Sequence, residues 1–142
     1  MVVFDQFQSN GNIPIYLQII LFIKKGIIAK SIVNNEELPS RRYLSTLLVI
    51  NPNTVQKAFR ILEEEGLISS SAGAKSVITV DEEKITSLKK ELLREDLQNL
   101  VQSMKAMGVD KEEVFLLIEE YWREEERRVW DLLSAVWIYR CG

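Results

Sequence analysis

The sequence predicts a mainly α-helical chain with one small β-hairpin, arranged as an N-terminal winged helix-turn-helix followed by a C-terminal two-helix hairpin. Two helix-start signals, Ser40 and Asn51-Pro52, predict two short helices joined by a tight turn. Gly66 is placed to end the second of these helices, and a short apolar strand-like run follows it. In the region that begins at residue 81, leucines recur at helical spacing, which predicts the C-terminal helices. The predicted domains are residues 1–80, the winged helix-turn-helix, and residues 81–142, a helical dimerisation domain.

Composition and charge limit the class of protein. Of 142 residues, 46% are hydrophobic and 27% are charged, which is typical of a soluble globular chain. No apolar stretch reaches the roughly 18–20 residues needed to cross a bilayer, and no secretory signal is recognisable. The single cysteine, Cys141, cannot form an internal disulfide. We therefore expect a cytoplasmic protein with no membrane partner, in which Cys141 is a bystander thiol.

The charge is distributed unevenly along the chain. Residues 1–80 hold 8 Lys/Arg and 6 Asp/Glu, a net charge of +2, whereas residues 81–142 hold 10 Lys/Arg and 15 Asp/Glu, a net charge of −5. The N-terminal half could therefore meet phosphate, while the C-terminal half would be repelled by it. A charge of +2 predicts ordinary affinity for nucleic acid and no strong non-specific coating.

The first predicted helix begins near Pro14 and carries an isoleucine every four residues from Ile15 to Ile27. The run Ile20-Leu21-Phe22 adds apolar residues outside this stripe of isoleucines, so the helix is apolar on more than one side. This helix is therefore either buried on two sides or helps to bury a second copy of the chain.

The next two helices form the helix-turn-helix. Ser40 caps the first, whose apolar face is expected to comprise Leu44, Leu47 and Leu48. Asn51 caps the second, and Pro52 takes its first position. The inward-facing residues of the second helix are predicted to be Val55, Phe59 and Leu62. Two short strands, 67–69 and 77–80, are expected to follow, with residues 70–75 as the hairpin tip.

The C-terminal region predicts two long helices with a turn near Gly108, and Asp110 with Glu113 resembles a capping box for the second. Two such helices cannot bury both apolar stripes on each other, so we infer a homodimer. The alternative is a two-helix arm folded back on the N-terminal domain. The predicted interface residues share the apolar stripe: Leu93, Leu97, Leu100, Met104, Val114, Ile118, Tyr121, Trp122, Val129 and Leu132.

The outward face of the helix after Asn51 has the side chains needed to read DNA. Packing its apolar residues inward leaves Asn53, Thr54, Gln56, Lys57 and Arg60 projecting outward. Asn and Gln can pair with adenine, and Lys and Arg suit guanine or phosphate. The alternative is an ordinary solvated polar face. The run 63–65, three glutamates, is interpreted as solvated and directed away from DNA.

Arg41 and Arg42 lie in the first turn of the preceding helix, where a guanidinium can hold phosphate. Alternatively, they are solvated charges or partners of Glu36 and Glu37. Ser70, Ser71, Gly73 and Lys75 would line the wing, or simply form a hairpin. The complete set of candidate DNA-binding residues is Ser40, Arg41, Arg42, Asn51, Asn53, Thr54, Gln56, Lys57, Arg60, Gly73 and Lys75.

The stretch 14–80 resembles the GntR family of bacterial winged-helix transcriptional regulators. The motifs that carry the resemblance are Leu38-Pro39-Ser40-Arg41-Arg42, Asn51-Pro52-Asn53-Thr54-Val55 and Glu65-Gly66-Leu67-Ile68. The resemblance implies a homodimeric repressor on a palindromic operator, with Arg42, the segment 51–57 and a wing glycine, Gly73, at the DNA. Many relatives have arginine where this chain has Pro52 and Gln56, so their operator sequence cannot be transferred. Relatives also often have a second wing glycine where this chain has Lys75, and its loss bears on the groove contact of the wing.

The C-terminal half looks like the YtrA subfamily, through the stretch 97–104 and Gly108-Val109-Asp110-Lys111-Glu112-Glu113. Two helices are expected to leave little room for the roughly 300 Å³ that a ligand pocket needs. Any small-molecule effector would sit near Tyr121, Trp122 and Trp130, and the alternative, that these aromatic residues fill a dimer core, is favoured. The chain has no histidine, and we expect neither a metal nor a cofactor.

Two other functions are considered. An enzyme is not expected, because the usual nucleophile–base pairs and a glycine-rich phosphate loop are lacking, and the carboxylates between Glu119 and Glu126 alternate with arginines on a charged helix. A winged helix that binds another protein instead of DNA is the remaining alternative, which the weak charge of residues 1–80 keeps open.

Overall fold

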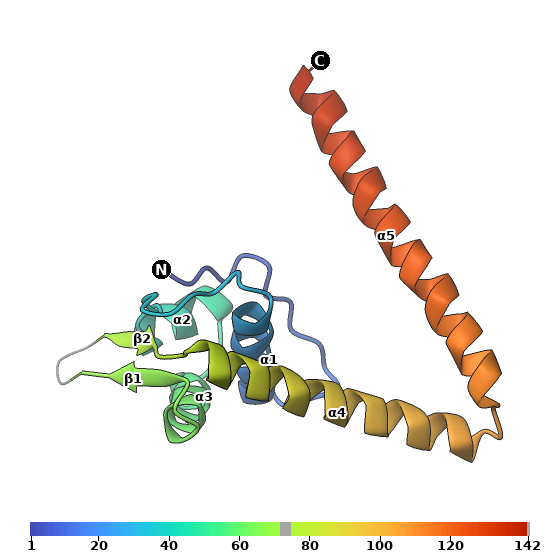
Figure 1. Cartoon of the computed structure of the whole chain (residues 1–142). Coiled ribbons are helices and arrows are strands. Elements are labelled where there is room, and N and C mark those ends of the chain that lie inside the picture. The colour runs from blue at the N-terminus through green and yellow to red at the C-terminus, as the bar shows by residue number, and fades with distance from the viewer. Residues whose placement is uncertain (72–74, 142) are drawn as a thin grey trace. The chain divides into compact units, whose positions relative to one another are not determined.

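The computed structural model describes the backbone of residues 1–71 and 75–141 and the side chains of residues 1–71 and 75–135. Its contacts form two compact units, Met1–Leu93 and Arg94–Gly142, which divide within one helix. The elements in chain order are α1 (Ile15–Ile28), α2 (Arg41–Leu48), α3 (Pro52–Glu64), β1 (Ile68–Ser70), β2 (Ser76–Ile78), α4 (Glu82–Ala106) and α5 (Lys111–Cys141) (Figure 1). This confirms the predicted fold class, while the functional boundary after residue 80 stays a prediction.

The N-terminal segment completes the hydrophobic core. Val2 and Phe4 are buried, and the Phe4 ring stacks on Phe22 of α1 with 4.9 Å between the ring centroids. Phe7 meets the same ring edge-on. The second apolar side of α1 is therefore covered within the chain, which supports burial on two sides. Residues before α1 are therefore part of the core of this unit.

The helix-turn-helix forms where its capping residues predict. The Ser40 hydroxyl accepts a hydrogen bond from the Tyr43 amide at 3.1 Å, and the Asn51 side chain accepts one from the Asn53 amide at 2.8 Å. These two caps satisfy amides that the first turn leaves without partners. On α2, Leu44 is fully buried, but Leu47 is 49% exposed. The prediction that Leu47 faces the core was wrong, because this two-turn helix buries a narrow stripe.

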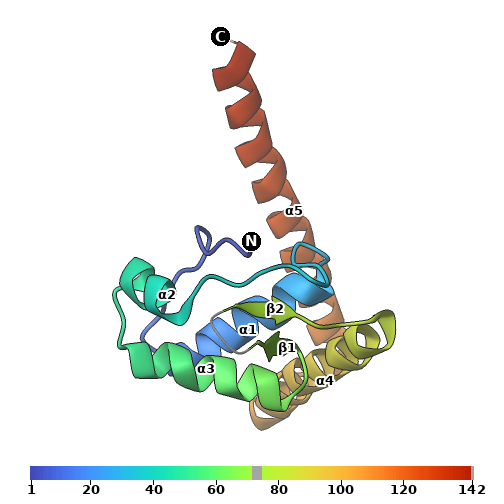
Figure 2. The same ribbon diagram turned by 90° about the vertical axis from the view of Figure 1, so that its left-hand side faces the viewer.

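The core of the first unit is the contact between α1 and α3. Figure 2 shows α3 across the front of this unit with α1 behind it. Four residues of α3 have no exposed surface: Val55, Ala58, Phe59 and Leu62. Ile19, Ile23 and Ile27 of α1 are equally buried. The helical spacing of the apolar residues of α3, which is visible in the sequence, therefore decides which face of this helix is exposed.

The β-hairpin has antiparallel register, with Ile68 opposite Ile78 and Ser70 opposite Ser76. The extended segment that precedes α2 supports the other edge of β2. The Leu38 amide donates to the Ser76 carbonyl at 2.8 Å, and the Ile78 amide donates to the Glu36 carbonyl at 2.9 Å. Because two strands alone are marginal, this third extended segment helps to hold the wing.

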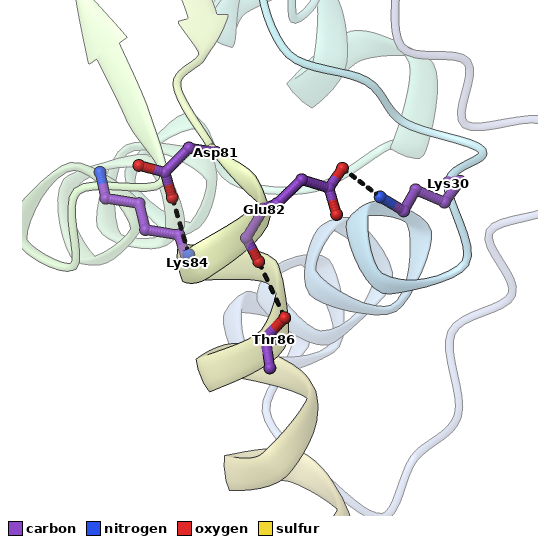
Figure 3. Close-up of polar contacts among 5 residues, drawn as sticks. All are labelled: Lys30, Asp81, Glu82, Lys84 and Thr86. Carbon is purple, nitrogen blue, oxygen red and sulfur yellow. Dashed lines mark hydrogen bonds and ion pairs between the residues drawn. The ribbon is translucent and has the colours of Figure 1, made fainter.

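The start of α4 is attached to the first unit (Figure 3). The Asp81 side chain caps the helix by accepting from the Lys84 amide at 2.7 Å, and Glu82 forms an ion pair with Lys30. The Lys84 ammonium donates to the carbonyl of Gly66 at 2.7 Å. Leu88 is buried in the core of the same unit. Polar and apolar contacts together fix the first turns of α4 beside the wing.

The second unit contains the end of α4 and all of α5. Gly108, with φ of +69°, lies in the turn between α4 and α5, where the sequence predicted a turn, and glycine adopts this left-handed conformation without strain. Every described side chain of α5 from Phe115 to Ala135 is exposed, so the two helices do not cover each other's apolar stripes in a single chain. None of the helices, searched over the described residues, is long and apolar enough to cross a membrane.

The turn between α2 and α3 contains a strained residue. Val49 has φ of +55° and is 89% exposed. This left-handed conformation costs an ordinary residue roughly 1–2 kcal/mol and is especially unfavourable for a β-branched side chain. The exposed valine buries too little surface to compensate.

We predict that Val49→Gly raises the free energy of unfolding by about 0.5–1 kcal/mol, because relief of strain exceeds the added backbone entropy of the unfolded glycine. Urea denaturation measures this change. Val33→Gly is the matched control, since Val33 is also exposed but has no positive φ; it is expected to destabilise. A loss of stability in both variants would contradict the prediction.

Candidate nucleic-acid interface

The outer face of α3 presents the predicted reading residues. Asn53, Gln56, Lys57 and Arg60 are exposed, and Thr54 is half-buried. They project outward because the four fully buried residues of α3 occupy its other face. Among the described residues, the side chains of Asn53 and Gln56 make no hydrogen bond within the protein. Their amide groups are therefore free to pair with base edges.

The two cations on this face have partners inside the chain. The Lys57 ammonium lies 3.9 Å from the centroid of the Tyr16 ring of α1, and Arg60 pairs with Glu64 at 3.1 Å. Both members of the Arg60–Glu64 pair are well exposed, so the pair is weak and easily exchanged for a phosphate. Lys57 is more firmly oriented, because its charge is held over an aromatic face.

Arg41 is the least available of the predicted contact residues. Its guanidinium donates to the Ser70 hydroxyl of β1 at 3.3 Å and lies 5.3 Å from the centroid of the Phe59 ring of α3. Glu63 is 3.9 Å away, and the Arg41 Nε is buried with no hydrogen-bond partner among the described residues. Neither Glu36 nor Glu37, the partners considered from the sequence, pairs with it. Arg41 thus connects α2 to α3 and the wing.

Arg42 lies beside Arg41 on α2 but is exposed, and its side chain forms no ion pair with any residue that the structure describes. It is the freest cation at this end of the helix-turn-helix. The side-chain oxygens of Ser40 and Asn51, also predicted contacts, are already used as helix caps. Ser40 and Asn51 can contact DNA only through the hydrogen-bonding groups that the two caps leave free.

The described residues of the wing are partly engaged with one another and with the segment before α2. The Lys75 ammonium pairs with Glu37 at 3.1 Å in an exposed position, and the Ser70 hydroxyl is 2.8 Å from that of Ser76. Gly73, the predicted wing glycine, lies outside the described residues. The described part of the wing therefore offers Ser71 and a weakly paired Lys75 to a partner.

The glutamates at the end of α3 are exposed or half-buried, as a solvated run requires, but each of them also forms an ion pair. Glu65 pairs at 2.7 Å with Lys24, a buried lysine of α1, and Glu63 and Glu64 face Arg41 and Arg60. The Lys24–Glu65 pair joins α1 to the end of α3. These carboxylates therefore stabilise the unit and take up cationic charge near its outer face.

The predicted dimerisation residues of the second unit partly surround a groove of about 960 Å³. Of the predicted set, seven line it: Leu100, Met104, Val114, Ile118, Tyr121, Trp122 and Val129. Leu93, Leu97 and Leu132 do not line it, although they are exposed. Leu117, Glu125, Glu126 and Trp130 complete the groove. The expectation that two helices leave little room for a ligand stays a prediction, because this groove is open in a single chain and a second copy would fill it.

Comparisons with known proteins agree with this geometry. Residues 15–78 match the family model described as bacterial regulatory proteins, gntR family. An uncharacterised helix-turn-helix regulator of Bacillus subtilis, YhcF, is 36% identical over 78% of this chain and 89% of its own length. The helix-turn-helix transcriptional repressor YtrA of the same organism is 33% identical over 81% of this chain and 89% of its own length.

Solved structures give the same result. A GntR family transcriptional regulator from Listeria monocytogenes superposes with a TM-score of 0.72 at 28% identity, covering 79% of this chain and 98% of that chain. A second Listeria monocytogenes protein, described as a transcriptional antiterminator, superposes with a TM-score of 0.66 at 31% identity, covering 81% of this chain and 88% of that chain. The similarity therefore extends beyond the helix-turn-helix into the C-terminal helices.

The contrast between the adjacent arginines generates a prediction. Arg41→Ala should lower the free energy of unfolding by about 1–2 kcal/mol, because it removes a cation–π contact and a hydrogen bond between elements. Arg42→Ala should change it by less than about 0.5 kcal/mol, because Arg42 is exposed and unpaired. Chemical denaturation of both variants provides the test, and equal effects would show that Arg41 does not join α2 to the wing.

Proposed function

The chain belongs to the GntR family of bacterial regulatory proteins, and from this premise we propose that it is a homodimeric transcriptional repressor that binds a palindromic operator. The observation that carries the proposal is the orientation of α3. Its apolar side is fully buried, and the free amides of Asn53 and Gln56 lie on the exposed side. A helix of this kind, following a tight turn, is the element that enters the major groove in helix-turn-helix proteins.

The chemistry of the exposed residues suits DNA. Asn and Gln can form paired hydrogen bonds with adenine, which gives sequence discrimination of about 1–3 kcal/mol per contact. Arg42 supplies a free guanidinium for phosphate, and the N-terminus of α3 adds a favourable dipole. Arg60 and Lys75 are paired only weakly, so both can add phosphate contacts to that of Arg42, while the amides of Asn53 and Gln56 supply the base contacts.

The exposed apolar side chains of the second unit support a two-fold dimer. The described part of α5 exposes large apolar residues, among them Phe115, Trp122 and Trp130, which a stable monomer would not leave in water. A second copy would cover them, and a two-fold pair of α3 helices would match a palindromic site. The repressor activity is proposed from the 33% identity to the YtrA repressor.

For DNA binding, we predict different effects of two substitutions. Arg42→Ala should weaken all duplexes and reduce the magnitude of the slope of log affinity against log salt by about 1. Gln56→Ala should reduce the binding free energy for the operator by about 1–3 kcal/mol. It should change the binding free energy little for a duplex that is altered at the contacted base pair. Fluorescence anisotropy with the protein's own promoter at several salt concentrations measures both effects.

Gln102→Ala is the matched control, since Gln102 is exposed on α4 and outside the helix-turn-helix; operator affinity should be unchanged. If neither Arg42→Ala nor Gln56→Ala alters binding, the assigned reading face is incorrect. Failure of the unaltered protein to bind any duplex from its own locus would favour the protein-binding winged helix.

For assembly, we predict a dimer at micromolar concentration, measured by size exclusion with light scattering. Ile118→Asp should raise the dissociation constant of the dimer at least about 30-fold, because the substitution places a charge in the apolar groove. Leu116→Asp is the control: Leu116 is even more exposed but does not line the groove. A monomeric unaltered protein, or equal weakening by both substitutions, would refute this interface.

A further inference from the structure

We propose that Tyr16 of α1 is a positioning residue for DNA binding: its ring holds the Lys57 ammonium at the edge of the outer face of α3, where the ammonium contacts a backbone phosphate. The inference deepens the proposed function and rests on it, because Lys57 meets a phosphate only in a protein that binds DNA. Tyr16 lies outside the helix-turn-helix, on the helix that precedes it. The packing of α1 against α3 brings the two side chains together.

The contact between the two side chains is close. The Lys57 ammonium lies 3.9 Å from the centroid of the Tyr16 ring, well inside the roughly 6 Å over which an aromatic face attracts a cation. Lys57 is exposed, whereas Tyr16 is half-buried. A long, exposed lysine side chain ordinarily samples many rotamers. Here its charged end has a definite place before DNA binds.

The ring that holds this ammonium is itself firmly supported. Tyr16 is in the first turn of α1 and packs against the hydrophobic core of the first unit. Gln18, which is buried, ties the start of α1 to the preceding segment: its side-chain amide donates to the carbonyls of Asn10 at 2.8 Å and Ile13 at 2.7 Å. The position of the ring is therefore set by the fold and does not depend on Lys57.

A neutral ring orients a cation without cancelling its charge. Arg60 and Lys75 each pair with a carboxylate, which a phosphate must displace before it can take the cation. Lys57 forms no ion pair with any residue that the structure describes, and its partner is an uncharged ring. An ammonium has three donors, and the ring occupies only one side of it. A phosphate can therefore bind on the open side while the ring contact persists.

The place of Lys57 on α3 favours a phosphate over a base. Asn53, Gln56 and Arg60 follow one another at spacings of three and four residues, so they form one row along the helix. Lys57 lies beside this row on the side of α1, because its ammonium reaches Tyr16. When the row enters a major groove, its flank faces the sugar-phosphate strand that borders the groove. A lysine ammonium meets such a strand as a point charge.

The test measures operator binding by fluorescence anisotropy at several salt concentrations. Lys57→Ala should weaken the promoter duplex and an unrelated duplex by the same factor, and reduce the magnitude of the slope of log affinity against log salt by about 1. A loss confined to the promoter duplex would show that Lys57 contacts a base and would overturn the phosphate assignment.

Tyr16→Leu should weaken the promoter duplex at least about threefold and leave the salt slope unchanged, because the ammonium still reaches phosphate but must be ordered on binding. Tyr16→Phe keeps the ring and should bind within about twofold of the unaltered protein. Equal losses in both variants would show that the hydroxyl acts, and tighter binding by Tyr16→Leu would show that the ring withholds the cation; either result overturns the proposal. Urea denaturation checks that each variant folds, and Tyr16→Met replaces Tyr16→Leu if the latter does not.

A double-mutant cycle separates positioning from general support of the fold. Tyr16→Leu introduced into Lys57→Ala should cause less than about 1.5-fold further loss, because Tyr16 acts only through Lys57. The same loss with and without Lys57 would show a merely structural role and overturn the proposal.

Lys25→Ala is the matched charge control, since Lys25 is exposed on α1 nine residues after Tyr16 and therefore on the opposite side of the helix. It should change neither the affinity nor the salt slope. An effect equal to that of Lys57→Ala would show that only the total charge matters, and would overturn the proposal.

The contact is also tested in the protein without DNA by nuclear magnetic resonance. The ε-methylene protons of Lys57 should be shifted upfield by the ring in the unaltered protein and in Tyr16→Phe, and not in Tyr16→Leu. A protein that binds its operator but lacks this shift, or shows no coupling in the cycle, refutes the positioning role and leaves the proposed function intact. A protein that shows the shift but binds no duplex from its own locus refutes the proposed function, and the phosphate contact with it.

Discussion

The fold depends on one contact, the packing of the apolar stripe of α3 against α1. Val55, Phe59 and Leu62 have no exposed surface, and Ile19 and Ile23 meet them from the other helix. A helix buried so completely on one side has no freedom to rotate about its axis, because any rotation would expose these side chains. The same contact therefore stabilises the unit and fixes which polar residues, including Asn53 and Gln56, face a partner.

Ion pairs and cation–π contacts then determine which charges on the surface remain available. Lys24, Arg41 and Lys57 are all directed at partners within the first unit. Arg42 is left free at the outer face. This arrangement explains how a unit with a small net positive charge can form a selective surface: few cations attract phosphate generally, while amides at fixed positions distinguish bases.

The second unit has the opposite character. Its helices are long and their apolar side chains are exposed in one chain, including the aromatic residues of the groove. Helices of this kind gain stability from packing against something else, since isolated amphipathic helices are marginal in water. The proposed assembly uses this surface, because a second copy would cover the side chains that one chain leaves in water.

The sequence by itself determined the elements and the outward face of α3. Caps such as Ser40 and Asn51, the left-handed Gly66 and Gly108, and the spacing of apolar residues act within a few residues, so a linear pattern reveals them. Only the tertiary structure decided that Phe4 covers α1, that Arg41 reaches Ser70, that Lys24 meets Glu65, and that α4 and α5 diverge around a groove. These contacts join residues far apart in the chain, and each residue type has several plausible partners until packing selects one.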